Sequence, residues 1–282
     1  MPSQVTESST FSLTSRKGAP IRTMDEWRDR REAVNSGWVP GKSAWETAYA
    51  WVGSGQPAIP PEFTLLLNSH DMTRETIFER GVVECKTPLR YRGGPRNHDV
   101  AVWGRKEGRR CFIGVESKAN DGFGATVQDQ LDGANDIRRK GKNTNQDMRA
   151  DWLSRILIGY GLLQGNDHNE VRDLPYQVLA GVAGTMFAAK ASQCALAVFV
   201  VHQFRTEFTD DQKIATDAEC LELFASLLVQ RNTARGLLAQ LPLQYGVLLG
   251  PIYFANRKCG AEQWDMPTNI PLFIGKVFTD RT

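Results

Sequence analysis

Two carboxylates and a lysine stand on neighbouring apolar segments of this chain, in a pattern that suits phosphodiester chemistry. Asp99 opens one β-rich run, and a short charged turn leads to a second run that ends in Glu116-Ser117-Lys118. Because side chains alternate between the two faces of a strand, Glu116 and Lys118 share a face. If the two runs pair antiparallel through the turn, Asp99 comes to lie beside them.

Oxygen ligands from two carboxylates suit Mg²⁺ or Mn²⁺, ions that keep several waters and take further ligands from phosphate. Such a metal polarises a phosphoryl oxygen and activates water. Lys118 would orient or deprotonate that water, or stabilise charge on the phosphate. The pattern therefore predicts a metal-dependent phosphodiester hydrolase with Asp99 and Glu116 as metal ligands. The alternative interpretation is a cross-strand charge pattern on the surface.

These residues also carry a family resemblance. The pattern Asp99…Glu116-Ser117-Lys118 resembles the PD-(D/E)XK (restriction endonuclease-like) nuclease superfamily, and the chain is similar, more narrowly, to an uncharacterised bacterial family of that type. The narrower resemblance covers roughly residues 79–204 and is carried by residues 83–89, 97–99, 115–118, 122–127, 174–179 and 201–204. It implies a core of helix, three strands, helix and strand, and an Mg²⁺-dependent endonuclease acting on DNA, in restriction or phage defence.

The resemblance also implies roles for residues outside the first pattern. Glu84, on the strand before Asp99, would supply a third metal-binding carboxylate, with Glu79 as the alternative. Gln177, at the start of a later helix, would support the catalytic site; the alternative is an ordinary amphipathic helix start. His98 stands where a proline often precedes the first aspartate, and we expect it to pack or cap.

A nucleic-acid enzyme of this composition needs a local basic surface, because the formal net charge is only +2. The best candidate is the run Arg138, Arg139, Lys140 and Lys142, which would contact phosphates. The alternative is a solvated helix end. Further arginines crowd the predicted strands, at positions 90, 92, 96, 105, 109 and 110.

Composition indicates a soluble, cytoplasmic protein. Hydrophobic residues make up 41% of the 282 residues and charged residues 23%, which is ordinary for a globular chain. The five cysteines are far apart and have no C-x-x-C spacing, which favours reduced thiols. No apolar run approaches the roughly 20 residues of a membrane helix. We therefore expect no membrane association, and the sequence leaves a homodimer open.

The order of predicted elements indicates an α/β fold with a mixed central sheet flanked by helices. We expect a disordered tail at 1–20, an N-terminal helical lobe at 21–72, and a nuclease-like α/β domain at 73–282 with a helical insertion at about 126–163. The apolar strand at 195–201 follows a helical crossover and should run parallel to an earlier strand. Later strands are expected at 245–249 and 272–278.

Other site chemistries fit poorly. The segment 37–43 ends in Gly-Lys-Ser, but a phosphate-binding loop needs glycine where Ser36 stands, and no strand precedes it. The four histidines have no zinc-ligand spacing. The competing hypothesis is a non-catalytic nucleic-acid-binding or scaffold protein that keeps the nuclease fold.

Overall fold

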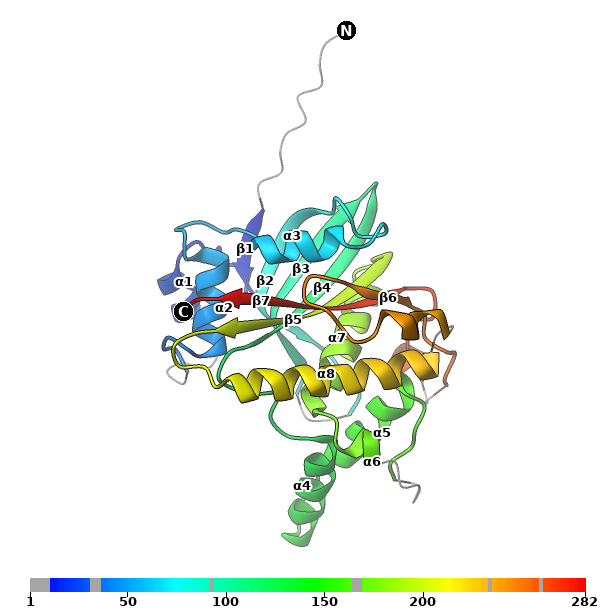
Figure 1. Ribbon diagram of the computed structural model, residues 1–282. Coiled ribbons are helices and arrows are strands. Elements are labelled where there is room, and N and C mark those ends of the chain that lie inside the picture. Colours follow the sequence, from blue (N-terminus) through cyan, green and yellow to red (C-terminus); the bar gives the residue numbers. More distant parts are fainter. Residues whose placement is uncertain (1–10, 31–36, 92–93, 164–168, 233–234, 259–260) are drawn as a thin grey trace.

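A seven-stranded mixed sheet with helices on both faces forms the centre of the computed structural model (Figure 1). The structure describes residues 11–30, 37–91, 94–163, 169–232, 235–258 and 261–282. The sheet order is β1-β2-β3-β4-β5-β7-β6. The strands are β1 Ser12–Ser15, β2 Ile77–Thr87, β3 Arg96–Lys106, β4 Arg109–Lys118, β5 Leu196–Arg205, β6 Leu249–Ile252 and β7 Leu272–Asp280.

The helices fall into two groups along the chain. The first comprises α1 Met24–Arg30, α2 Ser43–Val52 and α3 Pro61–Asn68. The second comprises α4 Val127–Arg139, α5 Gln146–Leu157, α6 Asn169–Arg172, α7 Tyr176–Ala191 and α8 Asp211–Asn232, with short 3₁₀ turns at Arg235–Gln240 and Glu262–Trp264. None of the helices in the described residues is long and apolar enough to cross a membrane.

The hairpin that carries the predicted site is a tight one. Lys106 pairs with Arg109 across a two-residue loop, Glu107-Gly108, in which both residues have positive φ (49° and 77°). Positive φ at both central residues is the type I′ geometry that matches the twist of the flanking strands. Strands β3 and β4 therefore pair antiparallel, as expected, and β5 returns after α7 to run parallel to β4, which confirms the predicted crossover.

Helix α7 packs closely on the sheet because two of its own glycines face the strands. A Cβ atom at Gly181 would lie 2.7 Å from the Phe199 ring, and one at Gly184 would lie 2.7 Å from the Arg96 side chain. The helix is apolar on all sides and almost fully buried, which is typical of a helix in a protein core. This close packing fixes the start of α7 relative to β3 and β4.

Helices α1–α3 lie within the helical segment expected at 21–72, and they pack directly on the sheet. Trp51 of α2 and Phe63 of α3 are buried in one hydrophobic cluster with Val100, Ile113 and Val198 of the central strands. Helices α1–α3 therefore form one outer layer of the sandwich, and α4–α8 form the other (Figure 1). The sequence predicts helices in this segment but does not show which face of the sheet they cover.

The expected disordered tail needs a correction. Residues 12–15 form β1, which pairs parallel with β2, and Leu13 is buried in the same cluster as α1–α3. Residues 1–10 of the predicted tail lie outside the described residues. A short strand at a sheet edge gains its stability from the neighbouring strand rather than from its own composition.

Other boundaries shifted for local reasons. The strand predicted at 245–249 begins only at Leu249, since Gly246 adopts a positive φ of 74° that interrupts the extended run. The sequence pattern predicts a helix at 217–230, and the structure extends it to α8, which begins at Asp211. The sequence pattern also predicts a helix at 24–34, of which α1 spans Met24–Arg30 and the remainder lies outside the described residues. The predicted insertion contains α4 and α5, and α4 projects from the body of the molecule (Figure 1).

Candidate active site

Asp99 and Glu116 face each other across the β3–β4 pair. Val100 is paired with Val115, so the antiparallel register places the two carboxylates opposite one another on the face covered by α7. Asp99 Oδ2 accepts a hydrogen bond from the backbone N–H of Ser117 at 2.7 Å. The hairpin therefore holds both acids at the same point of the sheet.

Lys118 completes the group from the same strand. Its Nζ lies 2.9 Å from Glu116 Oε1 and donates a hydrogen bond to Gln177 Oε1 at 2.8 Å. Gln177 is the second residue of α7, so the packing of that helix places its amide. The ring of Phe123 lies 5.3 Å from Nζ. The structure thus brings together Asp99, Glu116, Lys118 and Gln177, which we call the candidate site.

Arg96 is a further member that the sequence did not single out. Its guanidinium forms an ion pair with the other carboxylate oxygen of Glu116, and both side chains are buried. Arg96 begins β3, three residues before Asp99. It was one of several arginines counted near the predicted strands, and only its depth in the fold distinguishes it from the others. Glu116 therefore contacts one cation through each oxygen.

Burial shifts the pKa values of the two groups that the proposed chemistry needs most. Desolvation raises the pKa of Asp99, against the opposing effect of Lys118 and of the Ser117 N–H. Desolvation also lowers the pKa of Lys118, against the attraction of Asp99 and Asp121. Both shifts favour the neutral forms, so the two groups lie closer in proton affinity than they do in water.

Two aspartates that the sequence analysis missed border the site. Asp217 of α8 is buried and accepts a hydrogen bond from the Phe123 N–H at 3.1 Å. Burial raises its pKa, and Lys118 opposes that shift. Asp121 accepts a hydrogen bond from the Ser43 hydroxyl at 2.5 Å. The position of Asp121 directly after β4 was a usable signal, whereas nothing in the sequence linked Asp217 to this strand.

Ser43 connects this loop to α2. The spacing of Ser43 and Glu46 predicts an N-cap and a capping box for a helix that begins at residue 44. Helix α2 instead includes Ser43, and the Ser43 hydroxyl accepts the N–H of Ala119 at 2.9 Å. Glu46, expected in the capping box, accepts the N–H of Gly41. The first helices therefore fix the loop that leaves the candidate site.

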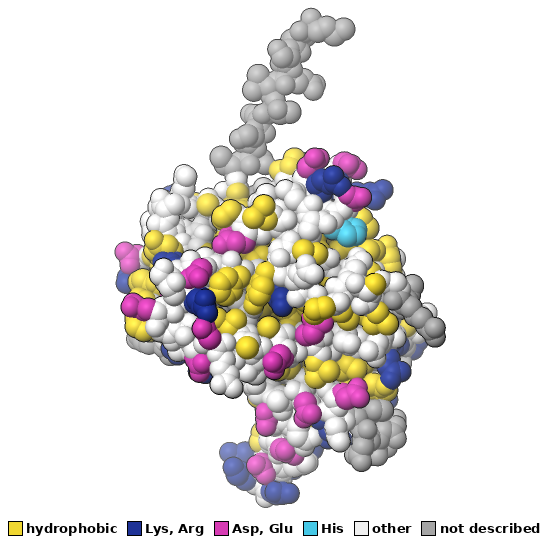
Figure 2. Space-filling view, in the orientation of Figure 1, with side chains coloured by type: hydrophobic (Ala, Val, Ile, Leu, Met, Phe, Trp, Pro, Cys, Tyr) yellow, Lys and Arg dark blue, Asp and Glu magenta, His cyan; other side chains and the backbone are white. Residues whose placement is uncertain are grey.

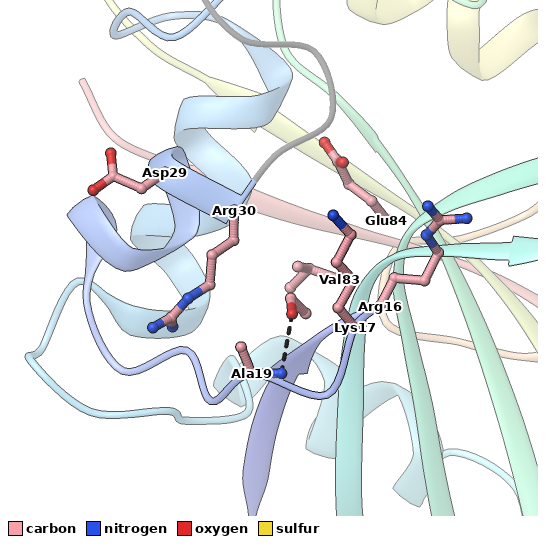
Figure 3. Close-up of a pocket in the computed structure, with 8 residues that line it drawn as sticks. Arg16, Lys17, Ala19, Asp29, Arg30, Val83 and Glu84 are labelled. Atoms are coloured by element: carbon pink, nitrogen blue, oxygen red, sulfur yellow. Dashed lines mark hydrogen bonds between the residues drawn. The ribbon is translucent and has the colours of Figure 1, made fainter.

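Glu84 does not join the site. It has a positive φ of 49°, which breaks the alternation of side chains along β2. Val83 packs towards α1–α3, while Cys85 packs on the opposite face. Glu84 lines a separate hollow of about 470 Å³ with residues that include Arg16, Lys17 and Arg30 (Figure 3).

The alternative acid, Glu79, also lies elsewhere, 3.1 Å from Arg105. Within the described part of the chain no group of three His, Cys, Asp or Glu residues is arranged to hold a metal. The candidate site therefore offers a pair of carboxylates, without the third that Glu84 was predicted to supply.

The paired carboxylates of Asp99 and Glu116 still fit a magnesium or manganese ion. Mg²⁺ is commonly held by one or two carboxylates and keeps waters and substrate phosphates as its other ligands. Asp99 has a single backbone N–H on one oxygen, so the described contacts leave it capacity as a ligand. Glu116 would exchange part of its contact with Arg96 or Lys118 for the ion.

The predicted basic run lies at the far end of α4 and in the turn after it. Arg138 is engaged by both carboxylate oxygens of Asp147 at 2.6 Å, and Arg139 lies 3.3 Å from Asp136. Lys140 and Lys142 are exposed. Figure 2 shows basic and acidic side chains together on this projecting end. At 1.5 Å per residue, the length of α4 is about 20 Å, so the run is not part of the candidate site.

Comparison with known proteins identifies a family but no curated relative and no solved structure. One family model matches residues 20–279, and it therefore includes both layers of helices and every strand except β1 and the last residue of β7. The chain belongs to the family described as "Domain of unknown function (DUF6946)".

Proposed function

We propose that this protein is a metal-dependent phosphodiester hydrolase, an endonuclease of the PD-(D/E)XK type acting on DNA. The observation that carries the proposal is the convergence of Asp99, Glu116 and Lys118 at one point of the sheet, with Lys118 2.9 Å from Glu116. The order of antiparallel β2-β3-β4 followed by parallel β5 also agrees with the core that the resemblance implies.

Each residue has a task in this proposal. Asp99 and Glu116 would hold Mg²⁺, which supplies positive charge against the phosphoryl oxygens. Lys118 lies at the same point with a pKa lowered by burial, so it is suited to exchange a proton with the attacking water or to stabilise charge on phosphate. Gln177 fixes the position of the Lys118 amine through their 2.8 Å hydrogen bond.

A second function is supported by the ion pairs of Glu116. Because Arg96 and Lys118 both contact this carboxylate, the site is internally neutralised, as in a fold that retains the nuclease shape for binding or scaffolding alone. This alternative requires DNA binding without a metal and without cleavage. It competes directly with the hydrolase proposal in the same experiment.

The test is cleavage of plasmid and single-stranded DNA with Mg²⁺ or Mn²⁺ by the wild type and by Asp99→Ala, Glu116→Gln and Lys118→Ala. We expect metal-dependent cleavage by the wild type. Loss of a proton-transferring group costs about 10²–10⁴-fold in rate, so Lys118→Ala should fall in that range. The two carboxylate variants should also lose Mn²⁺ binding, measured by calorimetry.

Glu84→Gln is the matched control, because it removes a strand carboxylate that lies in a different hollow. We expect it to cleave as the wild type does. Equal loss of cleavage in Glu84→Gln and Asp99→Ala would mean that Glu84 also belongs to the catalytic site. DNA binding that needs no metal, with no cleavage by the wild type, would replace the hydrolase with the binding function.

A further inference from the structure

A cavity of about 330 Å³ opens beside the candidate site and shares two residues with it. Arg96 and Gln177 belong to both. The other polar lining groups come from four elements: Asn97 from β3, Gln130 from α4, Arg149 from α5 and Tyr176 from α7. We call this space the arginine cavity.

The two arginines of this cavity are buried, and some of their guanidinium N–H groups have no hydrogen-bond acceptor among the described residues. Arg96 is 9% exposed and Arg149 is 4% exposed. Arg149 donates to the carbonyl oxygen of Gly94 at 2.6 Å, but its Nε and the Nε of Arg96 have no hydrogen-bond acceptor among the described residues. A buried guanidinium with open donors is costly unless an acceptor is supplied. Arg96 contacts Glu116 on one side and lines the cavity on the other.

The remaining wall of the cavity is also suited to a negative charge. None of its described lining residues is acidic. Helix α7 begins there, with Tyr176 and Gln177 as its first two residues, and no side chain of the described residues caps its N-terminus. The N–H groups of Tyr176 and Val178 already donate to the carbonyl oxygens of Ala125 and Pro175, at 3.0 and 3.1 Å. The dipole of this 16-residue helix still favours an anion at its N-terminal end.

Tyr176 adds a neutral donor. Burial raises the pKa of its hydroxyl, against the attraction of Arg149 and Arg96, so the group stays protonated at neutral pH. A tetrahedral anion with several acceptor oxygens matches this combination of two guanidinium groups, a hydroxyl and a helix start.

We infer that the arginine cavity is a phosphate-binding subsite of the candidate site. The source of the phosphate rests on the proposed function: it is either a terminal phosphate of a nucleic-acid strand or an internal phosphate next to the bond to be cleaved. The binding itself depends only on the cavity. It is therefore testable without cleavage and without a metal.

The experiment measures binding of inorganic phosphate by calorimetry in EDTA, which removes any contribution of the metal. Gln130→Glu adds one negative charge to the cavity wall without changing the size of the side chain. Asn135→Asp is its matched control, since Asn135 is exposed on the same helix and does not line the cavity. Arg149→Lys is a second variant that keeps the charge but loses the fork of donors.

We expect wild type and Asn135→Asp to bind phosphate equally, and Gln130→Glu to bind at least about tenfold more weakly, a difference of about 1.4 kcal/mol. Arg149→Lys should weaken binding in the same direction. Thermal melts check that all variants remain folded. No binding by the wild type, or equal binding by folded Gln130→Glu, would overturn the inference, whatever the result of the cleavage assay.

Competition with short single-stranded oligonucleotides, again in EDTA, separates the two sources. Displacement of phosphate only by oligonucleotides with a 5′- or 3′-terminal phosphate assigns the cavity to strand ends. Displacement also by unphosphorylated oligonucleotides assigns it to an internal phosphate. Failure of every oligonucleotide to compete would overturn the link to nucleic acid.

Discussion

The Asp99 carboxylate is held in a position that opposes its own ionisation. Burial raises its pKa, so the folded protein binds this proton more tightly than the unfolded chain does. Ionised Asp99 therefore destabilises the metal-free fold at neutral pH, and this cost is removed as pH falls through the raised pKa towards the ordinary value of 3.8. Ionisable groups whose pKa values are shifted by burial in this way are typical of functional sites.

We therefore predict that Asp99→Asn raises the melting temperature of the metal-free protein at pH 7. The asparagine keeps an oxygen to accept the Ser117 N–H but carries no charge. The gain should shrink as pH is lowered towards 4, where the wild type is protonated as well. Saturating Mg²⁺ should stabilise the wild type and leave the variant unchanged. A lower melting temperature for the variant at pH 7 would contradict this account.

At the scale of residues, the sequence predicted a side chain's position only where neighbouring residues in the chain determine it. Asp99, Glu116 and Lys118 were predictable because strand alternation and one short hairpin determine where they lie. Glu84 was misplaced because a positive φ at a residue other than glycine is rarely visible in a sequence. Asp217 could not be found, since 94 residues separate it from Phe123, its hydrogen-bond donor.

At the scale of elements, the patterns identified most strands and helices but not their layers. The mixed sheet and the crossover to β5 followed from the order of the elements. The assignment of α1–α3 to one face of the sheet required contacts such as that of Phe63 with His202, at 5.2 Å between ring centroids. Strand β1 takes its place in the sheet by pairing with β2, its neighbour there.

The predicted basic run lies at the far end of α4, a helix about 20 Å long, so the run and the candidate site should affect DNA differently. Arg138 is engaged by Asp147, which leaves Lys140 and Lys142 as the exposed cations of the run. We predict that Lys140→Gln/Lys142→Gln weakens binding of long duplex DNA and lowers the slope of log K against log salt by about 2, since each phosphate contact contributes about 0.9.

The measurement for this variant is a salt titration of duplex binding by fluorescence anisotropy in EDTA. Lys190→Gln, which changes an exposed lysine at the far end of α7, is the control and should leave the slope unchanged. Phosphate binding in the arginine cavity should be the same in all three proteins. An unchanged slope in the double variant would identify the run as an ordinary solvated helix end.

For the whole molecule, burial on both faces of one sheet has a consequence for acid stability. His98 is enclosed under α7, and His202 lies on the other face between Phe63 and Phe204. Burial lowers the pKa of each to about 3, whereas histidine in the unfolded chain titrates at 6.5. The Arg96 charge contributes further to the shift of His98.

The sign of the effect follows from proton binding. Between pH 6.5 and about 3 the unfolded chain binds a proton at each of these histidines and the folded protein does not, so stability is lost as pH falls. Each group contributes a slope of up to about 1.4 kcal/mol per pH unit. Asp99 and Asp217, whose pKa values are raised, act in the opposite direction at the acid end of this range.

We predict that His202→Gln reduces the loss of unfolding free energy between pH 6 and pH 4 by about 1.4 kcal/mol per pH unit. Glutamine has no titrating group and keeps a polar atom to pair with the Thr279 hydroxyl, which His202 Nε2 meets at 2.8 Å. Urea unfolding of both proteins across this range measures the difference, and the carboxylate contributions cancel because they are common to both. His70→Gln, at a partly exposed position, should change the slope less. Parallel pH profiles for the wild type and His202→Gln would show that this histidine takes up its proton in the folded protein as it does in the unfolded chain. The burial of His202 between the sheet and the helices would then not lower its pKa.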